Sequence, residues 1–256
     1  MSDILKGKVV IVTGAASGIG RAIAIGAAQH GAAAVIVSDI TETSNEGGTT
    51  TTSEIEALGV AVRFHRTDVS KRSEVDALIE SALEFGGVDV MVCNAGITLR
   101  SDGADVGEDD FHRLMSVNLD GVLFGAQAAA RQMQARGRPG SIVLMASMGG
   151  IAGAGMTVAY STSKGGVVLM AKALADALGP QGIRINAVAP GTIDTHLLRT
   201  NPAIAAASEG FRKRTPLRRL GKPSEIADAV AWLGSDMSSY VTGIALLVDG
   251  GLLSVI

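Results

Sequence analysis

The sequence contains little cysteine, few aromatic side chains and no long apolar segment. Cys93 is the single cysteine among 256 residues, so a disulfide framework and a cysteine metal cluster are both excluded. No apolar run reaches the roughly 18 residues that a membrane span needs, and the polar segment 1–8 lacks the apolar stretch of a signal peptide. Aromatic residues make up only 3%, so the core has to be packed from small and aliphatic side chains. We therefore expect a cytoplasmic protein with no membrane partner.

An excess of basic residues is also missing. The 22 lysines and arginines are outnumbered by 25 acidic residues, and the net charge of −3 gives no electrostatic basis for binding nucleic acid. The four histidines are scattered without the spacing of a metal site, and we expect no bound metal. Hydrophobic residues make up 47% of the chain, which is enough for one large domain.

Apolar segments rich in β-branched residues alternate with helical patterns along the whole chain. The expected strands are 8–13, 34–39, 60–66, 88–93, 141–146, 183–189 and 244–248. The expected helices are 20–30, 71–85, 108–136, 159–178 and 224–233. Continuous apolar strands that alternate with helices are typical of a parallel sheet covered on both faces. The prediction is a single doubly wound, Rossmann-like α/β domain over the whole chain, with a parallel sheet of about seven strands.

Two segments do not fit this alternation. Residues 41–53 contain Gly47, Gly48 and four consecutive threonines, and both residue types are poor in helix interiors. We expect a loop or a frayed helix start there before Glu54, as an irregularity of the surface. The stretch 194–220 shows no clear periodicity and is expected to be irregular.

A glycine-rich turn at 13–20 connects the first strand to the first helix. Its glycines let the backbone approach a pyrophosphate and let the helix pack closely on the strand. The free N–H groups of the helix N-terminus favour an anion there. The residues expected to contact a dinucleotide in this turn are Gly14, Ser17, Gly18, Ile19 and Gly20. Because Gly14 lies four residues before Gly18, the spacing differs from G-x-G-x-x-G, and the turn alone is a weak signal.

Asp39 at the end of the second strand indicates which dinucleotide is preferred. A carboxylate at this position can accept hydrogen bonds from the ribose hydroxyls and repels a 2′-phosphate. Neither the turn nor Ile40 supplies a basic side chain that could pair with such a phosphate. We therefore expect NAD as cofactor, with NADP disfavoured; the alternative for Asp39 is a helix N-cap or turn residue.

Tyr160 and Lys164 lie four residues apart in a predicted helix and so share one face of it. Tyrosine has an ordinary pKa of about 10 and is a poor base at neutral pH. A neighbouring ammonium and the positive ring of an oxidised nicotinamide both favour the phenolate, which makes Tyr160 a candidate general acid/base. Tyr-x-x-x-Lys is common by chance, so the pair alone is weak evidence.

The candidate residues share a position relative to the strands. Each of the following comes directly after a predicted strand: Gly14, Asp39, Asp68, Asn94, Ser147 and Pro190. Ligands of open α/β sheets bind outside the carboxyl ends of the strands. One such residue could mark an ordinary turn, but six at corresponding places indicate one ligand groove.

Together these motifs resemble the short-chain dehydrogenase/reductase family over nearly the whole chain. The resemblance is carried by Thr13-Gly14-x-x-x-Gly18-Ile19-Gly20, Asp68-Val69, Cys93-Asn94-Ala95-Gly96, Asn118, Ser147, Tyr160-x-x-x-Lys164 and Pro190-Gly191. Each motif is weak alone, whereas the order and spacing of the set are specific. The one departure is Cys93, which stands where the family usually has asparagine, at a position that supports the sheet.

The resemblance implies a role for each matching residue. Tyr160 is the acid/base, Ser147 hydrogen-bonds the substrate oxygen, Lys164 holds the nicotinamide ribose and lowers the pKa of Tyr160, and Asn118 supports a proton-relaying water. Further cofactor contacts are implied for Asp68, Val69, Asn94, Ala95, Gly96, Tyr160, Pro190, Gly191, Ile193 and Thr195. A lid at about 194–220 would cover the substrate, and the expected pocket comprises Ser147, Gly149, Thr157, Tyr160 and His196. Helices 108–136 and 159–178 would pair in a homodimer or homotetramer.

These observations predict an NAD-dependent oxidoreductase acting on a small secondary alcohol or carbonyl compound. The residues expected near the reacting atoms are uncharged apart from Lys164, which favours a neutral substrate such as a sugar or polyol. Reduction of a 3-oxoacyl group on acyl carrier protein is the alternative, and Asp39 weighs against its usual NADP. A non-catalytic dinucleotide-binding module is a third possibility, but no catalytic residue is missing.

Overall fold

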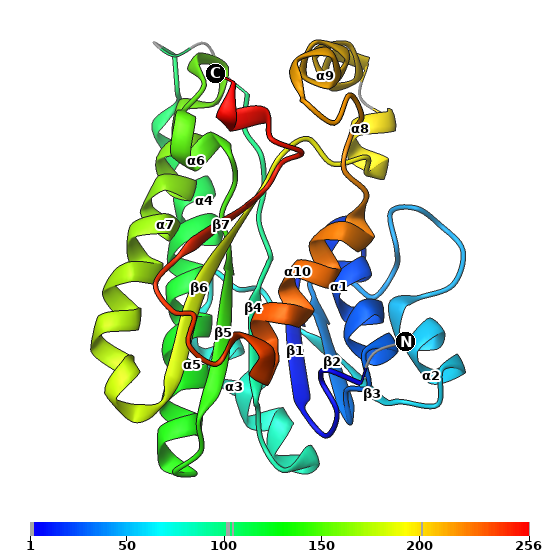
Figure 1. Ribbon diagram of the computed structural model, residues 1–256, viewed down its shortest axis with the longest axis vertical. Coiled ribbons are helices and arrows are strands. Elements are labelled where there is room, and N and C mark those ends of the chain that lie inside the picture. The colour runs from blue at the N-terminus through cyan, green and yellow to red at the C-terminus, as the bar shows by residue number, and fades with distance from the viewer. Residues whose placement is uncertain (1–2, 101–102, 104, 201, 256) are drawn as a thin grey trace.

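The carboxyl ends of seven parallel strands form one edge of the molecule. The computed structural model describes residues 3–100, 103, 105–200 and 202–255. Its strands are β1 (Val9–Thr13), β2 (Ala34–Asp39), β3 (Ala61–Arg66), β4 (Val90–Cys93), β5 (Gly140–Met145), β6 (Ile183–Pro190) and β7 (Ala245–Val248). They form one sheet in the order β3-β2-β1-β4-β5-β6-β7, with β3 and β7 at its edges (Figure 1). The prediction of a doubly wound α/β fold is confirmed.

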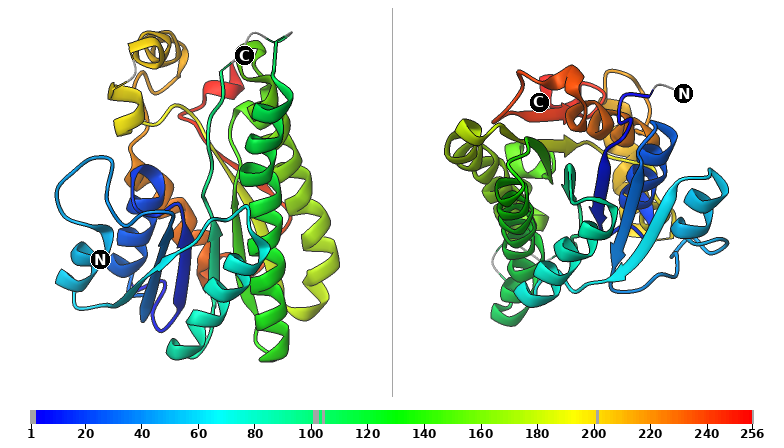
Figure 2. Two further views of the ribbon diagram at one scale, coloured as in Figure 1. Left: turned by 180° about the vertical axis from the view of Figure 1, so that it is seen from behind. Right: turned by 90° about the horizontal axis from the view of Figure 1, so that it is seen from below.

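Helices cover both faces of this sheet (Figure 2). The described helices are α1 (Gly18–Gln29), α2 (Thr51–Ala57), α3 (Arg72–Ser81), α4 (Glu108–Met115), α5 (Gly121–Ala135), α6 (Gly149–Ala152), α7 (Val158–Leu178), α8 (His196–Thr200), α9 (Pro202–Arg214) and α10 (Pro223–Gly234). Helices α1 and α10 pack on one face, and α3, α5 and α7 pack on the other. Within the described residues, no helix is long and apolar enough to cross a membrane.

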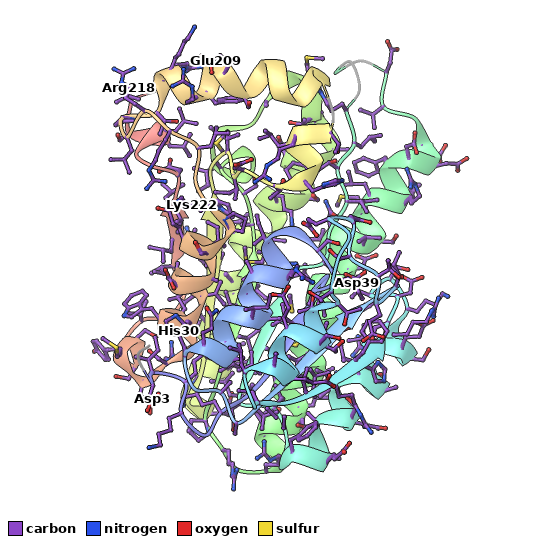
Figure 3. All side chains as sticks on the ribbon, turned by 90° about the vertical axis from the view of Figure 1, so that its right-hand side faces the viewer. Asp3, His30, Asp39, Glu209, Arg218 and Lys222 are labelled. Carbon is purple, nitrogen blue, oxygen red and sulfur yellow. The ribbon has the colours of Figure 1, made fainter. Side chains whose placement is uncertain are left out.

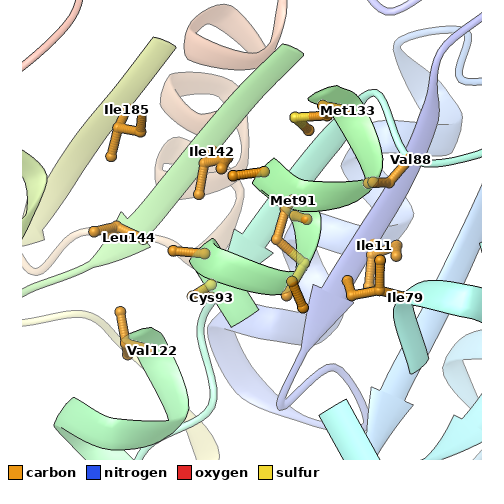
Figure 4. Packing of buried hydrophobic residues seen from close by; sticks show 14 of the residues in the cluster. Ile11, Ile79, Val88, Met91, Cys93, Val122, Met133, Ile142, Leu144 and Ile185 are labelled. Atoms are coloured by element: carbon orange, nitrogen blue, oxygen red, sulfur yellow. The ribbon is translucent and has the colours of Figure 1, made fainter. Parts of the chain in front are cut away.

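The strands are buried on both faces, so successive side chains enter two different cores. Val10 and Val12 point towards α1 and α10, whereas Ile11 and Met91 belong to the core under α3, α5 and α7 (Figure 4). Burying an aliphatic side chain of this size stabilises a fold by about 1.5–3 kcal/mol. Cys93 lies in the second core, and burial raises the pKa of its thiol to about 12. This cysteine is packed as a small apolar residue.

The sheet reverses its order between β1 and β4. The chain runs outward from β1 through β2 to β3, and then returns to place β4 on the other side of β1. In open α/β sheets, the crevice outside the carboxyl ends of the strands at such a reversal is the usual ligand site. The glycine-rich turn follows β1, and Asn94 follows β4, so both lie at this point.

The expected single helix at 108–136 is wrong. The structure divides it into α4, a π-helical turn at Ser116–Asp120, and α5. A π turn of this kind is frequent at functional sites. Asn118 lies in the turn and bonds a distant backbone segment, which gives the break a physical reason.

Two expectations for irregular segments also need correction. Helix α2 begins at Thr51, three residues before Glu54, because the hydroxyl of its N-cap Thr50 accepts a hydrogen bond from the N–H of Ser53. The segment 194–220 contains α8 and α9 instead of an irregular chain. Helix α9 has two standard helix signals: Pro202 at its start and three basic residues in its last turn. The prediction of an irregular chain gave more weight to the missing apolar periodicity than to these signals.

Candidate active site

Two adjoining cavities lie at the carboxyl ends of the strands. The larger has a volume of about 870 Å³ and runs from the glycine-rich turn to Asp39 and Asp68. The smaller, of about 310 Å³, contains Ser147, Tyr160 and Lys164. Residues that line both are Ile19, Asn94, Gly96, Ile97 and Thr195. The predicted groove is therefore present, with the dinucleotide residues at one end and the candidate catalytic residues at the other.

The glycine-rich turn has a shape that only glycine permits. Gly14 and Gly18 have positive φ values of 65° and 59°, a region that other residues rarely adopt. A Cβ atom at Gly20 would lie 2.0 Å from the carbonyl oxygen of Gly14. Nothing lies within 4 Å of a Cβ built on Gly18, so the turn is open towards the cavity. The N-terminus of α1 borders the cavity here and is suited to a phosphate group, with the N–H of Gly18 already bound by Glu46.

Asn94 and Thr13 join the ends of β1 and β4 under this turn. The side-chain amide of Asn94 donates to the carbonyl oxygens of Thr13 and Gly14, at 2.9 and 3.1 Å. The hydroxyl of Thr13 in turn accepts from the N–H groups of Asn94 and Ala95. Asn94, Ala95 and Gly96 all line the larger cavity, as the motif predicts. Their backbone is held by these bonds, which makes the cavity wall rigid.

Asp39 points into the turn from the end of β2. One carboxylate oxygen accepts from the N–H of Ala16 at 3.0 Å, and the other accepts from the N–H of Ile40 at 2.8 Å. The side chain lines the larger cavity, and Figure 3 marks its position beside α1. Asp68 and Val69 line the same cavity. The Asp68 carboxylate is oriented by the backbone and hydroxyl of Ser70.

The segment between β2 and α2 also reaches this cavity, which the sequence does not suggest. The Glu46 carboxylate accepts from the N–H of Gly18 at 2.8 Å and from the Ser44 hydroxyl at 2.5 Å. The N–H of Asn45 donates to the hydroxyl of Ser17 at 2.7 Å. Asn45 and Glu46 are thus two cavity residues that the sequence analysis missed.

Thr51 anchors the other end of that segment. Its hydroxyl donates to the carbonyl oxygen of Ala15 at 2.8 Å and accepts from the guanidinium of Arg21 at 3.2 Å. Arg21 also pairs with Glu54 at 2.6 Å. Thr51 is therefore buried against the glycine-rich turn and supports it, whereas residues 45–49 form an exposed loop, as expected.

Ser147, Tyr160 and Lys164 meet in the smaller cavity. Ser147 follows β5 and Tyr160 lies on α7, and both line this cavity. Lys164, one turn further along α7, places its Nζ atom 5.8 Å from the centre of the Tyr160 ring. The same Nζ donates to the carbonyl oxygen of Met145 at 2.7 Å. The three side chains therefore converge as predicted.

The protonation of this cluster is governed by burial. Burial raises the pKa of Tyr160 above its ordinary value, and the nearby Ser147 hydroxyl offsets part of the increase. Burial lowers the pKa of Lys164 to about 8. The expected lowering of the Tyr160 pKa by Lys164 is not found in this arrangement, because the ammonium bonds Met145 and lies over the ring instead of beside the phenol oxygen. The phenol is therefore the form present at neutral pH.

Asn118 acts on the cavity through Ile97. Its amide nitrogen donates to the carbonyl oxygen of Ile97 at 2.9 Å, and its amide oxygen accepts from the N–H of Ile97 at 2.8 Å. Asn118 is fully buried and lines neither cavity, whereas Ile97 lines both. Asn118 is thus placed as a positioning residue, and a role in proton relay stays a prediction.

The expected substrate pocket is only partly assembled. Ser147 and Tyr160 line the smaller cavity, but His196 lines the larger one, beside the cofactor residues. Gly149 and Thr157 line neither cavity: the N–H of Gly149 donates to the hydroxyl of Ser147 at 3.1 Å, and Thr157 lies against Ser161. Pro190, Gly191, Ile193 and Thr195 line the smaller cavity. The lining residues that were missed there are Ile97, Thr98, Met145, Ala146 and Leu198.

Comparisons with known proteins agree with this fold. A family model described as enoyl-(acyl carrier protein) reductase matches residues 14–253. An L-rhamnose 1-dehydrogenase (NAD(P)(+)) of Sphingomonas sp. (strain SKA58) is 44% identical over 97% of both chains. The 3-oxoacyl-(acyl-carrier-protein) reductase FabG of Thermotoga maritima is 41% identical, over 97% of this chain and 98% of its own.

A solved structure extends the comparison to three dimensions. A putative 2-deoxy-d-gluconate 3-dehydrogenase from Agrobacterium tumefaciens, with bound NADP, matches with a TM-score of 0.90 at 34% identity over 98% of each chain. The chain is thus an α/β oxidoreductase with a dinucleotide-binding fold. It belongs to the short-chain dehydrogenase/reductase family, as the resemblance of its motifs predicts.

Proposed function

We propose that this protein oxidises a secondary hydroxyl group of a neutral sugar or polyol with NAD. The observation that carries the proposal is the convergence of Ser147, Tyr160 and Lys164 on a cavity continuous with the one that holds Asp39. The relative from Sphingomonas, named for L-rhamnose and NAD(P), supports both the reaction class and a sugar substrate.

The residues present fit a dinucleotide. The pyrophosphate would lie at the N-terminus of α1, where Ile19 lines both cavities. Asp39 would accept hydrogen bonds from the adenosine ribose, and the adenine would lie against Val69. When bound, the nicotinamide supplies the hydride chemistry, which is its own and not the protein's.

The protein contributes orientation and proton transfer. Ser147 donates a hydrogen bond to the reacting oxygen of the substrate, and Tyr160, once ionised, accepts the hydroxyl proton of the substrate on its phenolate oxygen. Lys164 provides the positive charge that favours the ionised form of Tyr160 once the ammonium turns towards the nicotinamide ribose. Because burial raises the pKa of Tyr160, we expect oxidation to become faster as the pH rises and carbonyl reduction to be favoured at lower pH.

The lining of the smaller cavity supports a neutral, hydroxylated substrate. Among its described lining residues, Lys164 is the only charged one. Thr98, Ser147 and Thr195 supply hydroxyl groups, and Asn94 supplies an amide. Such groups can hydrogen-bond the hydroxyls of a sugar without requiring a charge on it.

The preference for NAD is the finer part of the proposal, and it rests on Asp39. The relatives include an enzyme named for NAD(P) and a structure that contains NADP, so the relatives leave both dinucleotides open. A 3-oxoacyl reductase is the second candidate, because one relative of 41% identity bears that name. We further propose a homo-oligomer in the cytoplasm.

Rates of formation or loss of reduced nicotinamide test the proposal. Purified protein is assayed with NAD and NADP against L-rhamnose, other aldoses and polyols, and in reverse against a 3-oxoacyl thioester with NADH and NADPH. We expect NAD-linked oxidation of at least one sugar or polyol, at a kcat/KM more than tenfold above that with NADP. Faster turnover of the 3-oxoacyl thioester with NADPH would instead establish the second candidate.

A further inference from the structure

We propose that Glu46 is a second specificity residue, which acts with Asp39 to exclude the 2′-phosphate of NADP from the adenosine end of the cavity. This inference deepens the proposed NAD preference and rests on it. It also gives a function to the segment between β2 and α2, whose composition did not indicate one.

Both carboxylates are bound by the same turn. Asp39 accepts from the N–H of Ala16, and Glu46 accepts from the N–H of Gly18. Backbone atoms two residues apart are separated by at most about 7 Å. Asp39 and Glu46 both line the larger cavity, as does Ser17 between their two anchor points. A dinucleotide in this cavity therefore meets two negative charges on adjacent parts of one turn.

The segment that carries Glu46 is fastened at both ends. On one side the N–H of Asn45 donates to Ser17, and on the other side Thr51 donates to the carbonyl oxygen of Ala15. Gly47 and Gly48, with positive φ values of 74° and 77°, allow the chain to reverse between these points. Figure 1 shows the resulting loop beside α1. Glu46 is thus held at the cavity by bonds on both sides.

Two guanidinium groups near Glu46, those of Arg21 and Arg199, are already paired. Arg21 bonds Glu54 at 2.6 Å, and Arg199 bonds both carboxylate oxygens of Asp194, at 2.8 and 3.1 Å. Glu46 itself is oriented by the hydroxyl of Ser44. A 2′-phosphate entering here would face Asp39 and Glu46 while these two guanidinium groups remain engaged elsewhere. Repulsion of this kind, unlike a missing contact, distinguishes NADP from NAD directly.

Binding of ADP-ribose and of ADP-ribose 2′-phosphate, measured by titration calorimetry, tests the proposal without any turnover. Glu46→Gln keeps an oxygen that can accept from Gly18 and removes only the charge. We expect the Kd for the 2′-phosphate to fall about tenfold at low ionic strength, the size of a partly screened contact between such charges. The Kd for ADP-ribose should change less than twofold, and Glu56→Gln, on the exposed side of α2, should change neither.

Salt and a second variant separate the possible failures. The gain from Glu46→Gln should shrink between about 20 mM and about 500 mM salt, because screening removes a repulsion but not a structural effect. Two results for Glu46→Gln would overturn the proposal. One is equally tighter binding of both ligands, since Glu46 would then hinder every dinucleotide. The other is an unchanged Kd for the 2′-phosphate ligand. The wild type and Asp39→Asn together test the underlying NAD preference. If the wild type already binds ADP-ribose 2′-phosphate more tightly than ADP-ribose, the proposed NAD preference fails, whatever the effect of Glu46→Gln.

Discussion

Lys164 combines a functional position with an unfavourable environment. Its ammonium is buried at the carboxyl edge of the sheet, where it donates a hydrogen bond to the Met145 carbonyl. Burial lowers its pKa from 10.5 to about 8. A lysine whose pKa is lowered in the folded protein destabilises the folded state at every pH at which it is charged in both the folded and the unfolded state. For Lys164 this is the range below about pH 8. The cost disappears as the pH rises towards the ordinary value, since the folded protein then releases the proton first.

Replacing this lysine should therefore stabilise the protein while it abolishes activity. We expect Lys164→Met to raise the free energy of unfolding at pH 7 by about 1–3 kcal/mol, the range given by a pKa difference of this size less the lost hydrogen bond. The gain should diminish between pH 8 and pH 10.5, in thermal unfolding followed by circular dichroism. Lys172→Met, at an exposed position of the same helix, is the control and should have little effect. A lower melting temperature for Lys164→Met at pH 7 would contradict this account.

Among the glycines of the turn between β1 and α1, Gly20 has the least room for a side chain. A Cβ atom at Gly20 would lie 2.0 Å from the Gly14 carbonyl oxygen and 2.5 Å from the Asn94 amide nitrogen. Those two groups are hydrogen-bonded to each other and cannot both move without opening the join between β1 and β4. The element therefore has no room to adapt.

Gly20→Ala should consequently disturb both stability and cofactor binding. We expect a loss of about 2 kcal/mol or more in the free energy of unfolding, and at least a tenfold weaker Kd for ADP-ribose. The matched control is Gly210→Ala in α9, where nothing lies within 4 Å of the new Cβ, and where alanine should be neutral or stabilising by about 1 kcal/mol. An unchanged Kd in a stably folded Gly20→Ala protein would show that the turn has another role.

The elements differ in how far their own residues determine them. The strands could be predicted because continuous β-branched runs such as that of β1 are typical of a buried parallel strand, whatever surrounds them. The π turn at Asn118 could not, since its cause is a pair of hydrogen bonds to Ile97, 21 residues away. The position of Glu46 likewise depends on a bond to Gly18 across 28 residues. Contacts between distant segments leave no periodic signal in a sequence.

At the scale of the whole molecule, the site exists because six parallel strands end at one edge. Residues at the ends of β1, β2, β3, β4, β5 and β6 line two connected cavities, and α7 adds the tyrosine and lysine. That part of the site follows from topology, which is why the residues after the strands could be identified in advance. The exceptions, Gly149, Thr157 and His196, lie on segments whose paths the strand pattern does not determine.

The central claim is that Tyr160 transfers the substrate proton, and that binding of NAD to the site does not depend on the Tyr160 hydroxyl. The most direct measurement compares the wild type with Tyr160→Phe in NAD-linked oxidation of a neutral sugar, with the Kd for NAD determined in parallel. We predict a fall in kcat of about a hundred- to ten-thousandfold with the Kd changed less than threefold. A Tyr160→Phe protein that keeps its kcat within a factor of three of the wild type would contradict the assignment and return the search to another acid/base in the cavity.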